Sequence, residues 1–285
     1  MRDKRFSRIY LEITNLCNRS CSFCPGTRRR PGFLSVEDFR LLAHKLRPYS
    51  DYLYLHVMGE PLTHPKLAEI LSAAAELGFH IILTTNGTLL PQKQEVLLCA
   101  PALHKVSISL HSFEANEIGG FGSYLTGCTD FGRCAAEKGI LVCYRLWNLD
   151  GAETVGLHEQ NDAILQQLRT VFPEPWQENS RGFRLVDRVY LEYGERFDWP
   201  DLAAPDRGAA GTCHGLRDQL AVLCDGSVVP CCLDHDGDLV LGNLFRQELD
   251  EILASPTAEA ILDGFRRREK VMPLCRRCGY AVRFG

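Results

Sequence analysis

Residues 8–26 read RIYLEITNLCNRSCSFCPG, and this stretch decides what is expected of the rest of the chain. Its opening residues, Arg8–Thr14, are rich in Ile, Leu and Tyr and predict a β-strand. Three cysteines follow the strand directly in a C-x3-C-x2-C pattern: Cys17, Cys21 and Cys24. In parallel α/β barrels, ligands and catalytic groups gather at the carboxyl ends of the strands. The stretch therefore predicts a cysteine-based site where the first strand ends.

Strand-like and helix-like segments alternate from residue 8 to about residue 195. Ser35 is typical of a helix N-cap before residues 36–46, and Gly78 and Gly139 are expected to close two later helices. Six such units predict a parallel α/β fold, and they fit an open, partial (βα)6 barrel better than a closed barrel of eight units. The strands expected after the first are Tyr52–Val57, His80–Thr84, Lys105–Leu110, Ile140–Leu146 and Arg188–Tyr193.

The pattern changes in the last third of the chain. Residues 173–212 are rich in Pro, Gly and charge and are expected to form a surface connector. Beyond them, two apolar runs flank Asp225-Gly226, which predicts a β-hairpin followed by helices. We therefore expect a barrel domain at 1–195, a connector at 196–212 and a small module at 213–285. A module of this size needs additional stabilisation, such as a metal site, because its hydrophobic core is small.

The composition narrows the class of protein. The chain has 285 residues, of which 45% are hydrophobic and 24% charged, as in soluble globular proteins. A net charge of -4 argues against a nucleic-acid partner, and the sequence has no apolar run long enough for a membrane helix. The charged start, MRDKRF, has no signal-peptide character, so a cytoplasmic location is expected. In a reducing cytosol, thirteen cysteines indicate metal or redox chemistry rather than disulfides.

The first cysteine group suits an iron-sulfur cluster. A four-iron cluster takes four ligands, so three thiolates would leave one iron open, whereas a zinc site would need a fourth ligand that the loop lacks. The C-x3-C-x2-C pattern, with Phe23 before its last cysteine, resembles the signature of the radical S-adenosylmethionine (SAM) superfamily. The resemblance implies that Cys17, Cys21 and Cys24 hold a [4Fe-4S] cluster whose open iron binds SAM. Reductive cleavage of SAM would then give a 5′-deoxyadenosyl radical.

Further motifs occur in the order that this resemblance implies. His56–Pro61, HVMGEP, resembles the family's Gly-Gly-Glu-Pro motif, with Met58 in place of the first glycine. The TTNG and SISLHS stretches end the third and fourth expected strands, and an arginine ends the fifth. Ordinary turn, strand or surface roles remain the alternatives for these residues. The SAM contacts that the resemblance implies are Phe23, Gly59, Glu60, Asn86, Ser109, His111 and Arg145.

The later cysteines resemble a second cluster module. Their spacing is similar to that of the twitch module, which is half of the longer SPASM module of some radical SAM enzymes. Cys224 and Cys232 compete for ligand roles; neighbours on a strand point to opposite faces, and the family spacing selects Cys231 over Cys232. A four-cysteine zinc site is the alternative. The resemblance implies an auxiliary [4Fe-4S] cluster held by Cys213, Cys231, Cys275 and Cys278.

The function that the resemblance implies is hydrogen abstraction from a substrate by a radical SAM enzyme. We expect oxidation (dehydrogenation) of a small molecule assisted by the auxiliary cluster, with a flavodoxin or ferredoxin as electron donor. A peptide- or protein-modifying maturase and a non-catalytic iron-sulfur or zinc protein are the alternatives. No catalytic base stands out, although Tyr193, Glu195 and Asp198 could face the open side. Arg28–Arg30 is typical of a solvated face, with an anionic substrate or electron donor as the alternative.

Overall fold

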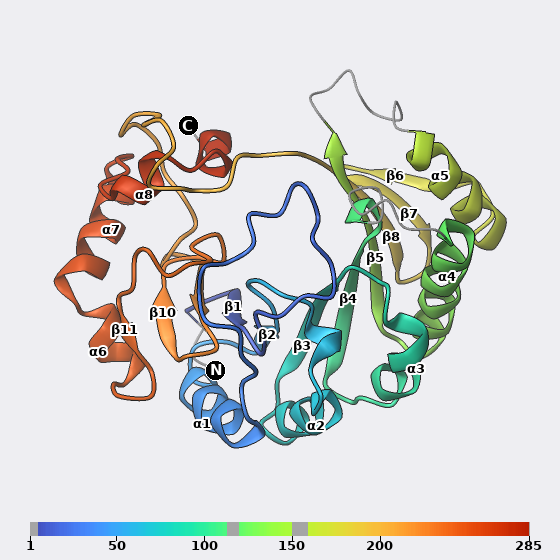
Figure 1. The fold of residues 1–285 in the computed structure, drawn as a ribbon, viewed down its shortest axis with the longest axis horizontal. Coiled ribbons are helices and arrows are strands. Elements are labelled where there is room, and N and C mark those ends of the chain that lie inside the picture. Colours follow the sequence, from blue (N-terminus) through green and yellow to red (C-terminus); the bar gives the residue numbers. More distant parts are fainter. Residues whose placement is uncertain (1–4, 113–119, 150–158, 285) are drawn as a thin grey trace.

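A computed structural model describes residues 5–112, 120–149 and 159–284 of the chain. Within these residues, one curved sheet runs in the order β11-β10-β9-β1-β2-β3-β4-β5-β8-β7-β6 (Figure 1). Its central strands are parallel, which confirms the six-unit open barrel expected from the sequence. These strands are β1 (Arg8–Leu11), β2 (Tyr52–Tyr54), β3 (His80–Thr85), β4 (Leu103–Ser109), β5 (Leu141–Leu149) and β8 (Val189–Glu195).

Helices connect the parallel strands along the outer, convex side of the sheet, as Figure 1 shows. The predicted cap is present, because the Ser35 side chain accepts a hydrogen bond from the backbone N–H of Asp38. Gly78 and Gly139 follow helix ends with φ values of 75° and 84°, which glycine adopts at little cost. The helices are α1 (Val36–Leu46), α2 (Leu67–Glu76), α3 (Leu90–Leu98), α4 (Phe121–Glu137) and α5 (Glu159–Val171).

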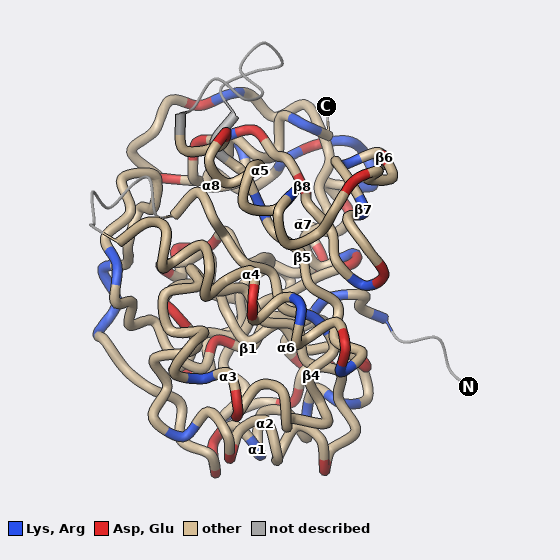
Figure 2. Tube along the Cα trace, turned by 90° about the vertical axis from the view of Figure 1, so that its right-hand side faces the viewer, with Lys and Arg blue, Asp and Glu red and all other residues tan. Residues whose placement is uncertain are grey.

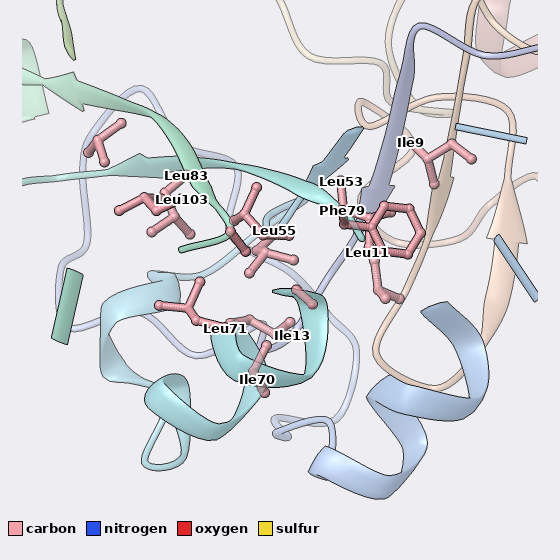
Figure 3. Close-up of a cluster of buried hydrophobic side chains, with 14 of the residues drawn as sticks. Ile9, Leu11, Ile13, Leu53, Leu55, Ile70, Leu71, Phe79, Leu83 and Leu103 are labelled. Carbon is pink, nitrogen blue, oxygen red and sulfur yellow. The ribbon is translucent and has the colours of Figure 1, made fainter. Parts of the chain in front are cut away.

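Alternation along the strands gives the sheet two different faces. Ile9, Leu11, Leu53 and Leu55 point outward and pack with α2 residues such as Ile70 in the main core (Figure 3). Fully burying a side chain of this size contributes roughly 1.5–3 kcal/mol. The intervening residues of the same strands point to the concave face, where Tyr10 and Tyr54 lie with their rings 4.8 Å apart. The concave face is therefore the more polar of the two.

Part of the expected connector forms strands instead. β6 (Gln177–Asn179) and β7 (Gly182–Val186) make a hairpin that pairs antiparallel with β8. The Asn179 side chain accepts a hydrogen bond from the backbone N–H of Arg181 and so fixes the turn. The prediction of a connector from residue 173 was wrong here, because β6 is polar and exposed on every residue and lacks the apolar pattern of a strand.

The C-terminal part of the described chain continues the same sheet. β9 (Gln219–Val222) pairs parallel with β1, and β10 (Ser227–Val229) pairs antiparallel with β9, which confirms the predicted hairpin at Asp225-Gly226. The remaining elements pack as a small layer beyond this edge (Figure 1). They are β11 (Gly242–Asn243), α6 (Leu249–Leu253), α7 (Pro256–Arg266) and α8 (Pro273–Arg276).

Charge is distributed evenly along the chain. Figure 2 shows Lys and Arg interspersed with Asp and Glu on the side it presents, without a basic stripe. No helix in the described ranges is both long and apolar enough to cross a bilayer.

Candidate active site

The first cysteine group lies in the loop that follows β1. Cys17 and Cys24 are exposed and Cys21 is half-buried, and the backbone N–H of Cys24 donates to the carbonyl of Cys21 at 3.0 Å. Desolvation by the surrounding loop raises the pKa of the Cys17 thiol, and the nearby Glu60, Cys21 and Cys24 raise it further. The three thiols therefore lie within electrostatic reach of one another at the carboxyl end of β1.

Gly59 lets the second motif contact this loop closely. Its φ is +76°, and a Cβ at this position would lie 2.7 Å from the backbone oxygens of both Thr14 and Leu16. The next residue, Glu60, donates its backbone N–H to the Leu16 carbonyl at 2.8 Å. Only glycine fits here, because a side chain would combine backbone strain with a steric clash.

The Glu60 side chain faces inward rather than toward solvent. It is 2% exposed and accepts hydrogen bonds from the backbone N–H groups of Asn86, at 2.7 Å, and Leu62, at 3.1 Å. Burial raises the pKa of this carboxyl to about 7 despite those hydrogen bonds. Glu60 thus ties its own turn to the end of β3.

Asn86 connects the end of β3 to the cysteine loop. Its Nδ2 donates to Asn18 Oδ1 at 2.9 Å and lies 4.0 Å from Cys17 Sγ. Its backbone carbonyl accepts a hydrogen bond from the Tyr124 hydroxyl at 2.8 Å. Next to it, the buried Cys128 packs under Gly87, in agreement with a structural role for that cysteine.

The remaining predicted contacts involve the cysteine loop, β4 and β5. Ser109 ends β4, but Arg145 lies in the middle of β5, which continues to Leu149 rather than ending near residue 146 as expected. The rings of Phe23 and His111 are 5.0 Å apart, and His111 Nδ1 is 3.1 Å from the Arg145 carbonyl oxygen. Ser109 pairs in register with Arg145, whose guanidinium lies 4.6 Å from the Trp147 ring centroid. The predicted residues therefore form two linked sets around the cysteine loop, one through Asn86 and Glu60 and one through Phe23 and His111.

The later cysteines divide between two faces. Burial raises the pKa of Cys275 to about 12, and the pKa values of Cys231 and Cys278 are also raised, chiefly by burial. Cys213 adds to the shift in each of these three thiols, and also to that of Cys232. Within the described ranges, no three His, Cys, Asp or Glu residues are gathered tightly enough to hold a single metal ion.

Cys232 and Cys224 face other groups. Cys232 hydrogen-bonds the Tyr10 hydroxyl, on the concave face of the sheet. Cys224 lies beside Glu12 and Arg29, and burial raises its pKa to about 12. Cys231 and Cys232 lie in a turn beyond β10, which ends at Val229, so the strand alternation on which the preference for Cys231 was based does not apply to them.

Sequence reasoning missed Glu12 and misread the arginine run. Arg29 forms a two-pronged ion pair with the fully buried Glu12, at 2.7 Å for each contact. Arg28 pairs with Asp236 and Asp238 of the C-terminal region. Neither arginine is part of a purely solvated face, because both bind acidic groups that are distant in sequence. The acidic cluster HDGD at residues 235–238 could have signalled the pairs of Arg28, whereas no sequence pattern marked Glu12 as the partner of Arg29.

His56 is a further residue without a predicted role. It follows β2 on the concave side, with its ring edge-on to Tyr10 at 5.4 Å. Its Nδ1 is buried without a hydrogen-bond partner among the described residues. Burial, followed by the charge of Arg145, lowers the pKa of His56 to about 3. The imidazole is therefore neutral at physiological pH.

Comparison with known proteins identifies the family. The pattern of the Radical SAM superfamily matches residues 11–126, and that of SPASM, an iron-sulfur cluster-binding domain, matches residues 213–279. The chain belongs to the radical SAM superfamily. It is a radical SAM enzyme with a C-terminal SPASM-like module, and these two domains imply [4Fe-4S] clusters and SAM as cofactors.

Several curated proteins are similar to this radical SAM enzyme. It is 26% identical to an S-adenosyl-L-methionine-dependent 2-deoxy-scyllo-inosamine dehydrogenase of Niallia circulans, over 88% of this chain and 83% of that protein. It is 27% identical to a GTP 3',8-cyclase of Synechococcus, over 67% of this chain. It is 24% identical to the subtilosin biosynthesis protein AlbA of Bacillus subtilis, over 86% of this chain. The chain spans 57% of the cyclase and 59% of AlbA.

Solved structures support the fold. The crystal structure of BtrN in complex with AdoMet and 2-DOIA superposes with a TM-score of 0.62 at 18% identity, covering 97% of this chain and 94% of BtrN. At this identity the likeness shows the fold alone. The donor sets of this radical SAM enzyme fit the implied cofactors, because the loop carries three free thiols and the SPASM-like module carries further free cysteines, among them the half-buried Cys213, Cys231 and Cys275 and the buried Cys278.

Proposed function

We propose that this enzyme binds SAM at a [4Fe-4S] cluster held by Cys17, Cys21 and Cys24 and uses it to dehydrogenate a small alcohol substrate. When SAM and the reduced cluster are bound, they supply the 5′-deoxyadenosyl radical that removes hydrogen from substrate. The loop site supports this proposal because it offers three thiols together, one fewer than a fully ligated four-iron cluster takes.

The residues around the loop are proposed to bind and orient SAM. Gly59 and Glu60 would present the turn against which its amino group lies, and the fixed Asn86 side chain would contact its ribose. Arg145 carries a guanidinium suited to a carboxylate, with Ser109 beside it in register. Phe23 and His111 would pack against each other beside the cysteine loop.

The auxiliary cluster is proposed to be held by Cys213, Cys231, Cys275 and Cys278. The match of the iron-sulfur cluster-binding SPASM domain to residues 213–279, which contain all four cysteines, is the observation that carries this assignment. Four protein ligands would leave no iron open to substrate, so the cluster would accept an electron rather than bind the alcohol. Electrons for SAM cleavage would come from a flavodoxin- or ferredoxin-like donor.

Dehydrogenation is favoured by the share of a known dehydrogenase that this chain covers. The chain aligns over 88% of its own length with 83% of the Niallia circulans dehydrogenase. Peptide modification is the second candidate, favoured by the similarity to AlbA over 86% of this chain.

A product assay with 2-deoxy-scyllo-inosamine tests the proposed reaction. Reconstituted enzyme, SAM and dithionite should convert the alcohol to its ketone, with one 5′-deoxyadenosine formed per ketone. Formation of 5′-deoxyadenosine without any ketone, together with modification of a precursor peptide, would instead establish the second candidate.

A further inference from the structure

The Glu12 carboxylate is shared by three separate segments of the chain. It follows β1 and is fully buried. Its Oε1 accepts hydrogen bonds from the Met58 backbone N–H, at 3.0 Å, and from Arg29, at 2.7 Å. Its Oε2 accepts from the Cys224 backbone N–H, at 3.1 Å, and again from Arg29, at 2.7 Å. Each oxygen thus receives one backbone and one guanidinium hydrogen bond.

Two of the three segments border the proposed SAM site. Met58 directly precedes Gly59 and Glu60, the turn that contacts the cysteine loop. Arg29 follows the same loop, five residues beyond Cys24. A shift of Glu12 would therefore displace the segments on both sides of the loop that carries the three thiols.

The third segment belongs to the SPASM-like module. Cys224 stands at the turn between β9 and β10, and this hairpin runs between the proposed ligands Cys213 and Cys231. Ligation at both ends would therefore constrain the hairpin and, with it, the Cys224 N–H that binds Glu12. A bound auxiliary cluster has in this way a direct mechanical connection to the carboxylate.

Arg29 strengthens the connection from the other direction. Its Nε donates to the His235 carbonyl at 2.7 Å, so one guanidinium bridges Glu12 and the C-terminal region. A buried ion pair gives little net stability, because the desolvation of both charges offsets their attraction. What the pair supplies is a fixed geometry between segments that are about 200 residues apart in sequence.

We propose that Glu12 is a positioning residue that couples the two cluster sites, so that SAM binds more tightly when the auxiliary cluster is in place. The inference rests on the proposed function, because it uses the cluster ligands assigned there. Coupling of this kind is reciprocal, so bound SAM should also stabilise the auxiliary cluster against loss.

A thermodynamic cycle of four proteins tests the coupling. The four proteins are wild type, Cys275→Ala/Cys278→Ala, Glu12→Gln and the variant that combines all three substitutions. Each is reconstituted anaerobically and kept without reductant. The Kd of labelled SAM is then measured by equilibrium dialysis. Removing the auxiliary cluster should weaken SAM binding about tenfold with Glu12 present, and less than about twofold in the Glu12→Gln background. Arg40→Ala, which removes an exposed ion pair with Glu76 between α1 and α2, is the matched control and should keep the full tenfold effect.

Two results would overturn the proposal. One is an unchanged Kd after loss of the auxiliary cluster in the wild-type background, and the other is equal weakening in the Glu12→Gln background. If Glu12→Gln does not hold its first cluster, Glu12→Gln/Arg29→Met replaces it in the cycle, because removing both charges leaves no unpaired buried ion. Failure of the proposed function is recognised separately, because the reduced wild-type enzyme then forms no ketone from the alcohol, whatever Kd values the cycle gives.

Discussion

Tyr10 and Cys232 share a hydrogen bond on the concave face of the sheet, whereas Cys231, the adjacent residue, lies with Cys213 and Cys275. We therefore expect the adjacent Cys231 and Cys232 to differ in role, with Cys231 as a cluster ligand and Cys232 as a structural residue. Cys231→Ala should remove about four of the eight irons expected for two four-iron clusters, and Cys232→Ala should remove none. Iron analysis and Mössbauer spectra of the two variants check this, and equal loss of iron from both would refute the ligand assignment.

Gly59→Ala should impair SAM binding through the backbone. The new Cβ would meet the Thr14 and Leu16 oxygens at 2.7 Å, so the turn must withdraw from the cysteine loop. We expect at least about a tenfold rise in the Kd of SAM, which corresponds to about 1.4 kcal/mol.

The matched control for this prediction is Gly139→Ala. Gly139 has a similar φ of +84°, but an added Cβ there would meet no atom within 4 Å, so the change carries the backbone strain alone. It should cost about 1 kcal/mol of stability and leave SAM binding intact. Equal effects of the two variants on SAM affinity would show that the close contact of Gly59 is unimportant.

The raised pKa of Glu60 predicts a pH-dependent stability. Because burial raises this pKa from its ordinary value of 4.5 to about 7, the folded state holds a proton that the unfolded state has released in that interval. Its stabilising contribution is complete below pH 4.5 and is lost as the pH rises through 7. Glu60→Gln is uncharged at every pH, although its NH2 group faces one of the two backbone N–H donors. Relative to this variant, wild type should lose about 2–3 kcal/mol of stability between about pH 5 and about pH 8.

Denaturant unfolding without SAM, followed by circular dichroism at both pH values, measures this difference. A stability difference between Glu60→Gln and wild type that stays constant from about pH 5 to about pH 8 would contradict the assignment of a raised pKa to Glu60.

The parallel strands and the cysteine loop could be predicted because they depend on local patterns. Apolar runs mark β1 to β5, and helix signals such as Ser35 and Gly78 mark what lies between them. The β6 strand could not be predicted, because it is exposed and pairs only through its backbone. The Glu12–Arg29 pair was also beyond reach, since an arginine next to a cysteine loop looks solvated until the fold brings a buried carboxylate to it.

The central claim is that Cys17, Cys21 and Cys24 hold a cluster that cleaves SAM. Its most direct test is mass-spectrometric detection of 5′-deoxyadenosine from anaerobically reconstituted, dithionite-reduced enzyme with SAM. Wild type should form 5′-deoxyadenosine, and the Cys17→Ala/Cys21→Ala/Cys24→Ala variant should form none while keeping about four irons. Wild-type enzyme that carries about eight irons and forms no 5′-deoxyadenosine would contradict the account.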